Sequence, residues 1–394
     1  MTHPTNSSTT DPAAGLRGVL EPYIDSGTIP GAVGLVARGD RVEVAAVGSA
    51  HLEGAVPMAR DAIFRIASVS KPITAAAVMM LVDDGRIALD DPIATWLPEL
   101  AAPVVVRTPD APVDDVVPAA RPVTVADVLT FRAGYGMPSD FSLPALQPLF
   151  TELKQGPARL SGFAGPDDWL AALARIPMLH QPGDAWLYNT GSDIQGALIA
   201  RVSGRSFAEF LAERIFEPLG MADTGFTVAA TALDRLTSAY GTGADGGIEL
   251  SDPPGEEWTK APGFTSGAGG LVSTVDDWFA FARMLLAEGT VDGRRLLSAR
   301  SVRMMTTDHL TRSQRDASEL FLEGQGWGFG GSVDVAETDP WNVLGRYGWV
   351  GGSGTTAHIT PSTGAVSILF TQRSMTGPTP PQVMRDFWRY AAGV

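Results

Sequence analysis

The stretch FRIASVSKP, residues 64–72, carries the strongest local signal in the chain. A helical pattern runs from Ser68 to Asp84, and Gly85 is well placed to end that helix. Residues at spacing i, i+3 share a helix face, so Ser68 and Lys71 are expected to lie within hydrogen-bonding reach. A helix N-terminus also favours negative charge that develops beside it. The stretch therefore predicts a serine hydroxyl and an amine side by side at the start of a buried helix.

This pairing suits nucleophilic catalysis. A serine hydroxyl is a poor nucleophile until a base removes its proton, and lysine can be that base only when neutral. Burial among apolar residues lowers the pKa of an amine, to about 7–8 in catalytic lysines. The chain has three lysines, and only Lys71 has a serine three positions before it. An ordinary helix start with an exposed lysine would show the same short pattern, so further signals are needed.

Other catalytic patterns are missing from the sequence. The five histidines lack metal-ligand spacing, no serine lies in a G-x-S-x-G elbow, and no glycine-rich loop precedes a Lys-Ser/Thr pair. The absence of cysteine excludes disulfides, thiolate nucleophiles and Cys-ligated metals. A net charge of −15 disfavours nucleic acids and anionic membrane surfaces as partners. We expect neither metal nor cofactor, and a small-molecule acyl ester or amide as the substrate.

Strand-like segments lie at both ends of the chain, with helices and loops between them. The strand candidates are residues 32–37, 42–47, 327–333, 347–350, 355–360 and 365–372. The simplest assembly is an α+β fold, with one antiparallel sheet flanked by helices and a mainly helical lobe inserted into it. We expect a disordered arm over residues 1–12 and a single domain over 13–394. Its α/β lobe would comprise about 13–85 plus 265–394, and its helical lobe about 86–264, with an inserted loop at 102–122.

The N-terminus gives an expectation about location. Residues 1–15, MTHPTNSSTTDPAAG, have neither the basic region nor the apolar core of a signal peptide. No run of 18 apolar residues occurs elsewhere in the chain. We therefore expect a cytoplasmic protein, while a chain from which a leader had been removed would look the same.

Five segments occur in the order found in a known superfamily. They are residues 64–72, 123–130, 182–191, 269–274 and 348–354. Together they resemble the serine β-lactamases and penicillin-binding proteins. More narrowly, they resemble class C β-lactamase-like esterases (family VIII carboxylesterases) and D-alanyl-D-alanine carboxypeptidase-related hydrolases. The resemblance spans roughly residues 15–390, and it implies a β-lactamase/transpeptidase-like fold with Ser68 as nucleophile and Lys71 as its base.

The resemblance also implies a third catalytic group, Tyr188. In the family this tyrosine helps to relay the serine proton to the leaving group. Penicillin-recognising relatives read Y-x-N, whereas Thr190 stands at that place here and Asn189 comes one position early. A core tyrosine with a satisfied hydroxyl is the alternative interpretation of Tyr188.

The third family motif departs further, because the chain contains no K-T-G. The corresponding place reads WVGG, residues 349–352, which is similar to the variant of esterase-like members. A backbone N–H near Gly352 or Ser353 would join that of Ser68 as the oxyanion hole, unless the glycines form only a β-bulge. In penicillin-acting relatives the missing lysine helps to hold a substrate carboxylate, and nothing basic replaces it in this motif.

Aromatic residues are candidates for the substrate cleft, although such rings more often serve in packing. The candidates are Tyr135, Trp186, Trp327 and Trp349. Apolar walls with few charges would suit an uncharged acyl ester. The expected oxyanion and substrate-binding residues are Gly351, Gly352, Ser353, Trp349 and Tyr135.

These observations predict a serine hydrolase that forms an acyl-enzyme on Ser68. We expect a carboxylesterase acting on short or medium acyl esters. A β-lactamase, a D-amino-acid amidase or peptidase, or an acyltransferase using the same acyl-enzyme is the alternative. A non-catalytic binding or sensor protein on the same fold would belong to another class, and it would have no need of Ser68, Lys71 and Tyr188 together.

Overall fold

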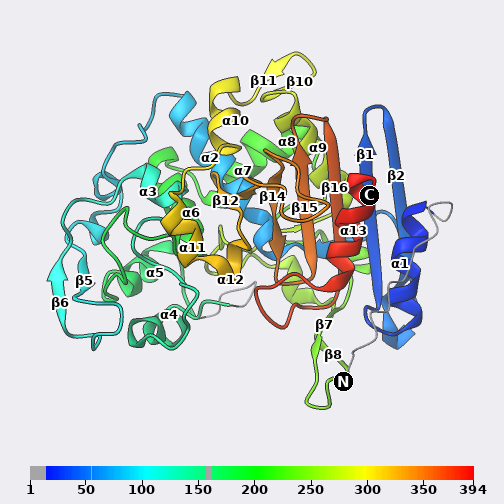
Figure 1. The fold of residues 1–394 in the computed structure, drawn as a ribbon, viewed down its shortest axis with the longest axis horizontal. Coiled ribbons are helices and arrows are strands. Elements are labelled where there is room, and N and C mark those ends of the chain that lie inside the picture. The colour runs from blue at the N-terminus through cyan, green and yellow to red at the C-terminus, as the bar shows by residue number, and fades with distance from the viewer. Residues whose placement is uncertain (1–14, 55, 157–161) are drawn as a thin grey trace.

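A computed structural model describes residues 15–54, 56–156 and 162–394, and the predicted arm over residues 1–12 lies outside the described residues. Strands from both ends of the chain form one eight-stranded antiparallel sheet (Figure 1). The order across the sheet is β12 (Gly326–Trp327), β13 (Ser332–Val333), β14 (Tyr347–Gly351), β15 (Thr355–Thr360), β16 (Ala365–Thr371), β1 (Gly31–Arg38), β2 (Arg41–His51) and β3 (Val56–Pro57). This confirms the predicted assembly of the terminal strands into one sheet.

The junction between the two ends of the chain lies at the centre of this sheet. β1 pairs with β16 from Ala32 opposite Thr371 to Ala37 opposite Val366. All but the last residue of β1 is buried, which explains its nearly continuous run of apolar residues. The junction therefore holds the first and last parts of the chain in a fixed register.

Helices cover both faces of the sheet. On one face, α1 (Gly15–Asp25) and α13 (Gln382–Ala392) pack together over an apolar cluster that includes Leu20, Leu369 and Phe387. On the other face lie α2 (Lys71–Asp83) and α9 (Val275–Leu286), as Figure 1 shows. Every residue of α2 from Lys71 to Leu81 is buried, so this helix is the central element of the molecule.

The middle of the chain is mainly helical, as predicted. Its helices are α3 (Val125–Leu129), α4 (Gln147–Thr151), α5 (Pro166–Leu173), α6 (Thr190–Ser203), α7 (Phe207–Leu211) and α8 (Glu217–Leu219), with one π-helical turn at Ala212–Phe216. Two hairpins were not predicted: β5 (Val104–Val106) with β6 (Val116–Pro118), and β7 (Ala239–Thr242) with β8 (Ile248–Asp252). The expected loop at 102–122 therefore contains a short two-stranded sheet.

The remaining elements complete the last third of the chain. They are β9 (Val272–Ser273), which pairs with β4 (Phe64–Arg65), β10 (Thr290–Val291) with β11 (Arg294–Arg295), and the helices α10 (Ala299–Met305), α11 (Arg312–Ala317) and α12 (Glu319–Leu322). In the part of the chain that the structure describes, no helix is long and apolar enough to cross a membrane.

One predicted strand was wrong in detail. Residues 327–333 form a hairpin between β12 and β13 instead of a single strand. Gly330 lies at its turn with φ of +79°, and a Cβ there would lie 2.5 Å from the carbonyl oxygen of Lys71. The chain reverses at this glycine because the hairpin must pass close to the first turn of α2.

Candidate active site

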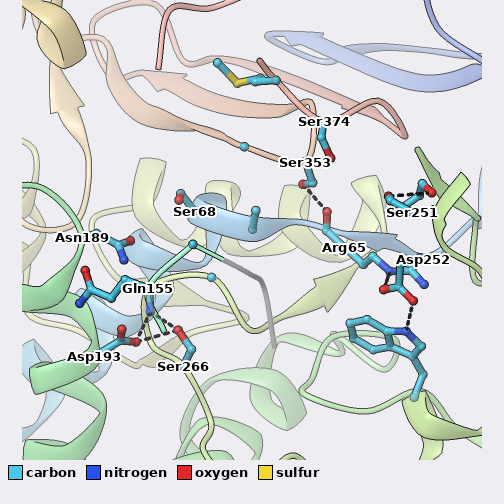
Figure 2. Close-up of a pocket in the computed structure, with 18 of the residues that line it drawn as sticks. Arg65, Ser68, Gln155, Asn189, Asp193, Ser251, Asp252, Ser266, Ser353 and Ser374 are labelled. Atoms are coloured by element: carbon cyan, nitrogen blue, oxygen red, sulfur yellow. Dashed lines mark hydrogen bonds and ion pairs between the residues drawn. The ribbon is translucent and has the colours of Figure 1, made fainter. Parts of the chain in front are cut away.

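Ser68 lies in a tight turn directly before α2. Residues Ala67–Ser70 form a 3₁₀ turn, so the α-helix begins at Lys71 and not at Ser68 as predicted. Ala67 has φ of +44°, a conformation that non-glycine residues rarely adopt. The hydroxyl of Ser70 donates to the carbonyl of Ala67 at 2.7 Å and helps to hold the turn. In this position Ser68 lines a cavity (Figure 2).

The amine of Lys71 has three hydrogen-bond partners and no exposed surface. Its Nζ lies 2.8 Å from the Oγ of Ser68, 2.9 Å from the Oδ1 of Asn189 and 2.6 Å from the carbonyl oxygen of Ala268. The amide and carbonyl oxygens can only accept hydrogen bonds. A neutral amine would therefore give its two hydrogens to Asn189 and Ala268, and its lone pair would face the hydroxyl of Ser68.

The surroundings of Lys71 favour this neutral form. Burial lowers the pKa of the amine to about 7, against an opposing effect from the negative charge of Asp193. Asp193 lies on α6, and its Oδ1 accepts hydrogen bonds from the Oγ of Ser266 at 2.7 Å and from the N–H of Ala268 at 3.1 Å. A neutral amine close to a serine hydroxyl is thus accessible near neutral pH.

Tyr188 is the third group at this point. Burial raises the pKa of its phenol to about 12, while hydrogen bonds with Ser68 and Trp349 act in the opposite direction. The indole Nε1 of Trp349 donates to the Oη of Tyr188 at 2.8 Å. The Nζ of Lys71 lies 4.6 Å from the centre of the Tyr188 ring. The structure therefore brings the three predicted catalytic residues together, with the phenol protonated at neutral pH.

Asn189 and Asp193 were not among the predicted site residues. Asn189 stood one place away from the expected Y-x-N position, yet its side chain contacts Lys71 directly. Its φ is +84°, and asparagine adopts positive φ more readily than most residues do. Asn189 is the N-cap residue of α6, but its side chain makes no capping hydrogen bond and contacts Lys71 instead, so no local pattern indicated this contact. The contact of Asp193 with residues 266–268 also had no local signal, because it depends on the packing of α6.

The glycine-rich end of β14 lies against the Ser68 turn. A Cβ at Gly351 would lie 2.6 Å from the carbonyl oxygen of Ile66, so only glycine allows this approach. Gly352 faces open space and lines the cavity. The hydroxyl of Ser353 donates to the carbonyl of Arg65 at 2.6 Å. This segment therefore borders Ser68, as predicted, and Ser353 holds it in place.

The expected aromatic cleft is not present, and this prediction needs correction. Tyr135 is 3% exposed and belongs to the hydrophobic core. Trp186, Trp327 and Trp349 pack in one cluster behind Tyr188, because large rings gain most when they are removed from water. Trp349 thus contacts Tyr188 and not the cavity.

The cavity beside Ser68 is large and has a mixed lining. Its volume is about 710 Å³. Figure 2 shows Ser68 between Asn189, Gln155 and Asp193 on one side and Arg65 with Asp252 on the other. The described residues that line it are Arg65, Ala67, Ser68, Gln155, Gly156, Asn189, Asp193, Ala239, Ser251, Asp252, Glu257, Trp258, Ser266, Ala268, Gly269, Gly352, Ser353, Ser374 and Met375. Apolar atoms make up the larger share of this lining, as expected, and serines and carboxylates lie among them.

Arg65 lines this cavity, and its charge is paired with a carboxylate. The Nε of Arg65 donates to the Oδ2 of Asp252 at 2.7 Å, and its guanidinium lies 4.6 Å from the centre of the Trp258 ring. Arg346 and His358 both lie against Trp388 of α13, on the face of the sheet away from α2. Neither is among the described residues that line the cavity. In residues 15–54, 56–156 and 162–394, no group of three or more His, Asp or Glu side chains could hold a metal ion.

Comparisons with known proteins identify the family of the chain. The sequence profile of the beta-lactamase family matches residues 16–387. Protein Rv1367c of Mycobacterium tuberculosis is 38% identical over 367 residues, which cover 91% of this chain and 89% of the relative. Esterase EstB of Burkholderia gladioli is 30% identical over 337 residues, which cover 81% and 78%. The chain therefore belongs to the beta-lactamase family, in which serine hydrolases and acyltransferases share one fold.

Solved structures confirm the predicted fold. The structure of EstCE1, described as a hydrolase with promiscuous acyltransferase activity, superposes with a TM-score of 0.78. The match covers 96% of this chain and 98% of that chain at 24% sequence identity. The β-lactamase/transpeptidase-like fold thus extends over nearly the whole of this chain.

Proposed function

We propose that the protein is a carboxylesterase that transfers the acyl group of a small ester to Ser68 and then to water. The observation that carries the proposal is the fully buried amine of Lys71 at 2.8 Å from the Oγ of Ser68. Its other partners are uncharged acceptors, so no contacting carboxylate holds the amine in its charged form. This is the arrangement that a lysine needs to act as a general base.

The proposed reaction has two halves. In the first, the Oγ of Ser68 attacks the ester carbonyl carbon while its proton passes to the neutral amine of Lys71. Backbone N–H groups of Ser68 and of Gly352 or Ser353 hold the oxyanion. The carbon–oxygen bond to the leaving group breaks, and the alcohol receives a proton through the Oη of Tyr188, which is restored from the Lys71 ammonium. In the second half, water attacks the acyl carbon and gives a proton to the neutral amine of Lys71. The bond between the acyl carbon and the Oγ of Ser68 breaks, the Lys71 ammonium returns the proton to this oxygen, and the carboxylic acid leaves.

The charges of the cavity favour an ester over a β-lactam. A β-lactam or a peptide C-terminus brings a carboxylate, which would need a cation. The described lining contains one arginine, Arg65, which is paired with Asp252. The carboxylates of Asp193, Asp252 and Glu257 belong to the same described lining, so acidic side chains outnumber basic ones there, which supports an uncharged substrate. An acyltransferase remains the second candidate, because an alcohol or amine can attack the same acyl-enzyme as water does.

The Ser68→Ala variant tests the proposal. We expect hydrolysis of p-nitrophenyl butyrate to fall by at least about 10⁴-fold, with an unchanged circular dichroism spectrum. Intact-protein mass spectrometry after rapid mixing with the ester would show the added acyl group in the wild-type enzyme and its loss in the variant. The exposed Ser362→Ala variant is the matched control and should retain full activity.

Different outcomes contradict different parts of the proposal. Retained activity in Ser68→Ala would remove the nucleophile and with it the mechanism. Faster turnover of nitrocefin than of p-nitrophenyl esters would keep Ser68 but overturn the choice of substrate. Product transfer to an added alcohol in preference to water would favour the acyltransferase.

A further inference from the structure

We propose that Asp193 is a positioning residue that sets the pH at which Lys71 becomes available as a base, an inference that rests on the proposed function. Asp193 does not touch the amine through any hydrogen bond that the structure shows. It acts through the turn at residues 266–268 and through its buried charge. The argument depends on contacts, burial and the balance of charges around Lys71.

The contacts form a chain from Asp193 to the amine. The Oδ1 of Asp193 accepts from the Oγ of Ser266 and from the N–H of Ala268. The carbonyl oxygen of Ala268 in turn accepts from the Nζ of Lys71 at 2.6 Å. One residue, Ala268, therefore connects the carboxylate to the amine. Figure 2 shows Asp193 and Ser266 directed toward each other beside Asn189.

Asp193 accepts hydrogen bonds from three donors inside the protein. It is 1% exposed, and burial raises the pKa of its carboxyl group. The hydrogen bonds donated by Ser266 and by the N–H groups of Gly267 and Ala268 act in the opposite direction, and so does the positive charge of Lys71. Donors of this kind stabilise the ionised form. The contacts therefore favour a negative charge on Asp193 when Lys71 is protonated.

No other charged group among the described residues acts on Lys71. Its contacting groups Ser68, Asn189 and Ala268 are neutral, and the phenol of Tyr188 is protonated at neutral pH. Of the charged groups, only Asp193 affects the amine within the part of the chain that the structure describes. Burial favours the neutral amine and Asp193 favours the ammonium, so the two effects oppose each other.

This balance suits a lysine that must first accept and then return a proton. Burial alone would make the amine a weak base, because its pKa would fall far below neutral pH. A carboxylate in direct contact would hold the ammonium and prevent proton uptake. Asp193 lies between these cases, because Ala268 separates it from Lys71 in the hydrogen-bond chain. The carboxylate therefore favours the protonated state of Lys71 without a direct hydrogen bond to the amine.

The Asp193→Asn variant removes the charge and can keep the hydrogen bonds from Ser266 and Ala268. Both are accepted by Oδ1, which an asparagine also provides, whereas the N–H of Gly267 then has only this one amide oxygen available. Without the negative charge the pKa of Lys71 should fall further, so the neutral amine persists to lower pH. We expect the acid limb of the pH profile of kcat/KM for p-nitrophenyl butyrate to move about one pH unit toward acid. The same shift should appear in the rate at which a fluorophosphonate probe labels Ser68.

The Asp277→Asn variant is the matched control. Asp277 is also a buried carboxylate and lies on α9. It accepts hydrogen bonds from the Oγ1 of Thr224 and from the N–H of Asp223. Its removal should leave the acid limb in place. A merely structural role for Asp193 would lower activity at every pH without moving the limb.

The outcomes separate this inference from the proposed function. An unmoved limb in folded Asp193→Asn, or a shift toward alkaline pH, overturns the role of Asp193 and leaves the esterase intact. Absence of ester hydrolysis by the wild-type enzyme overturns the proposed function, while the fluorophosphonate profile still reports on Lys71. If Asp193→Asn does not fold by circular dichroism, Asp193→Ser removes the same charge and must show the same direction of shift.

Discussion

Two buried cations from one short segment, Lys71 and Arg65, have opposite surroundings. The Nζ of Lys71 contacts a hydroxyl, an amide oxygen and a carbonyl oxygen, but no carboxylate. The guanidinium of Arg65 contacts the carboxylate of Asp252 and the backbone carbonyls of Thr237 and Pro253. Both residues are at least 94% buried. Burial alone therefore does not decide what a cation does in this protein.

The contacting carboxylate makes the difference. A guanidinium stays protonated in proteins, and an ion partner fixes it further as a structural group. An amine that lacks such a contact loses the stabilisation of its charge, and the pKa of Lys71 falls to about 7. The segment of residues 64–72 thus carries one cation, Arg65, that is fixed in an ion pair, and another, Lys71, that can exchange a proton.

Removal of the Lys71 amine should have the largest effect. In Lys71→Met the apolar chain is kept and the base is lost. We expect kcat/KM for p-nitrophenyl butyrate to fall by about 10⁴-fold. The exposed Lys154→Met variant controls for the loss of a lysine and should keep its activity. Activity of Lys71→Met within a few-fold of wild type would mean that another group serves as the base.

Conversion of Lys71 into a cation like Arg65 should have the next largest effect. Asn189→Asp places a carboxylate where Oδ1 now lies 2.9 Å from the amine. An opposite charge at this range raises the pKa of an amine by roughly 1–3 units, so less neutral amine exists at pH 7. We expect kcat/KM at pH 7 to fall by about 10- to 100-fold and to recover at alkaline pH. The acid limb of the profile therefore moves toward alkaline pH, opposite to the shift expected for Asp193→Asn.

The control for this variant is Asn189→Gly. Glycine tolerates the φ of +84° and removes the amide without adding a charge. Its acid limb should not move toward alkaline pH, even if its overall activity is lower. If Asn189→Asp shows the wild-type limb, the absence of a contacting carboxylate is not what makes Lys71 a base.

Loss of the Arg65 side chain should affect stability more than chemistry. Breaking a fully buried ion pair costs about 3–5 kcal/mol. Because 37% of the Asp252 side chain is exposed, we expect Arg65→Met to lower the free energy of unfolding by about 2 kcal/mol. Urea denaturation measures this change, and the acid limb of the pH profile should stay in place.

The exposed pair of Arg60 and Asp276 is the matched comparison. Their side chains are 57% and 42% exposed, so Arg60→Met should cost less than about 1 kcal/mol. Equal losses in Arg60→Met and Arg65→Met would show that the burial of Arg65 adds nothing to its structural role.

Much of the fold followed from the sequence because it depends on local patterns. The span 355–360 was predicted as a strand, and it matches β15. The hairpins at 104–118 and 239–252 were missed, because short strands that pair away from the main sheet leave little periodic signal. The strand expected at 327–333 is a hairpin, because its glycines permit a reversal that periodicity does not reveal.

The sequence by itself determined the pairing of Ser68 with Lys71, because a spacing of three residues in a helical turn is set by the local backbone. Only the tertiary structure decided which groups surround that amine. Asn189 is 118 positions away from Lys71 and Ala268 is 197 positions away. The carboxylate of Asp193 contacts the N–H of Ala268 and makes no hydrogen bond with the amine of Lys71 itself. This arrangement depends on how α6 packs against α2. That packing, and not the local motif, separates the base from the structural cation.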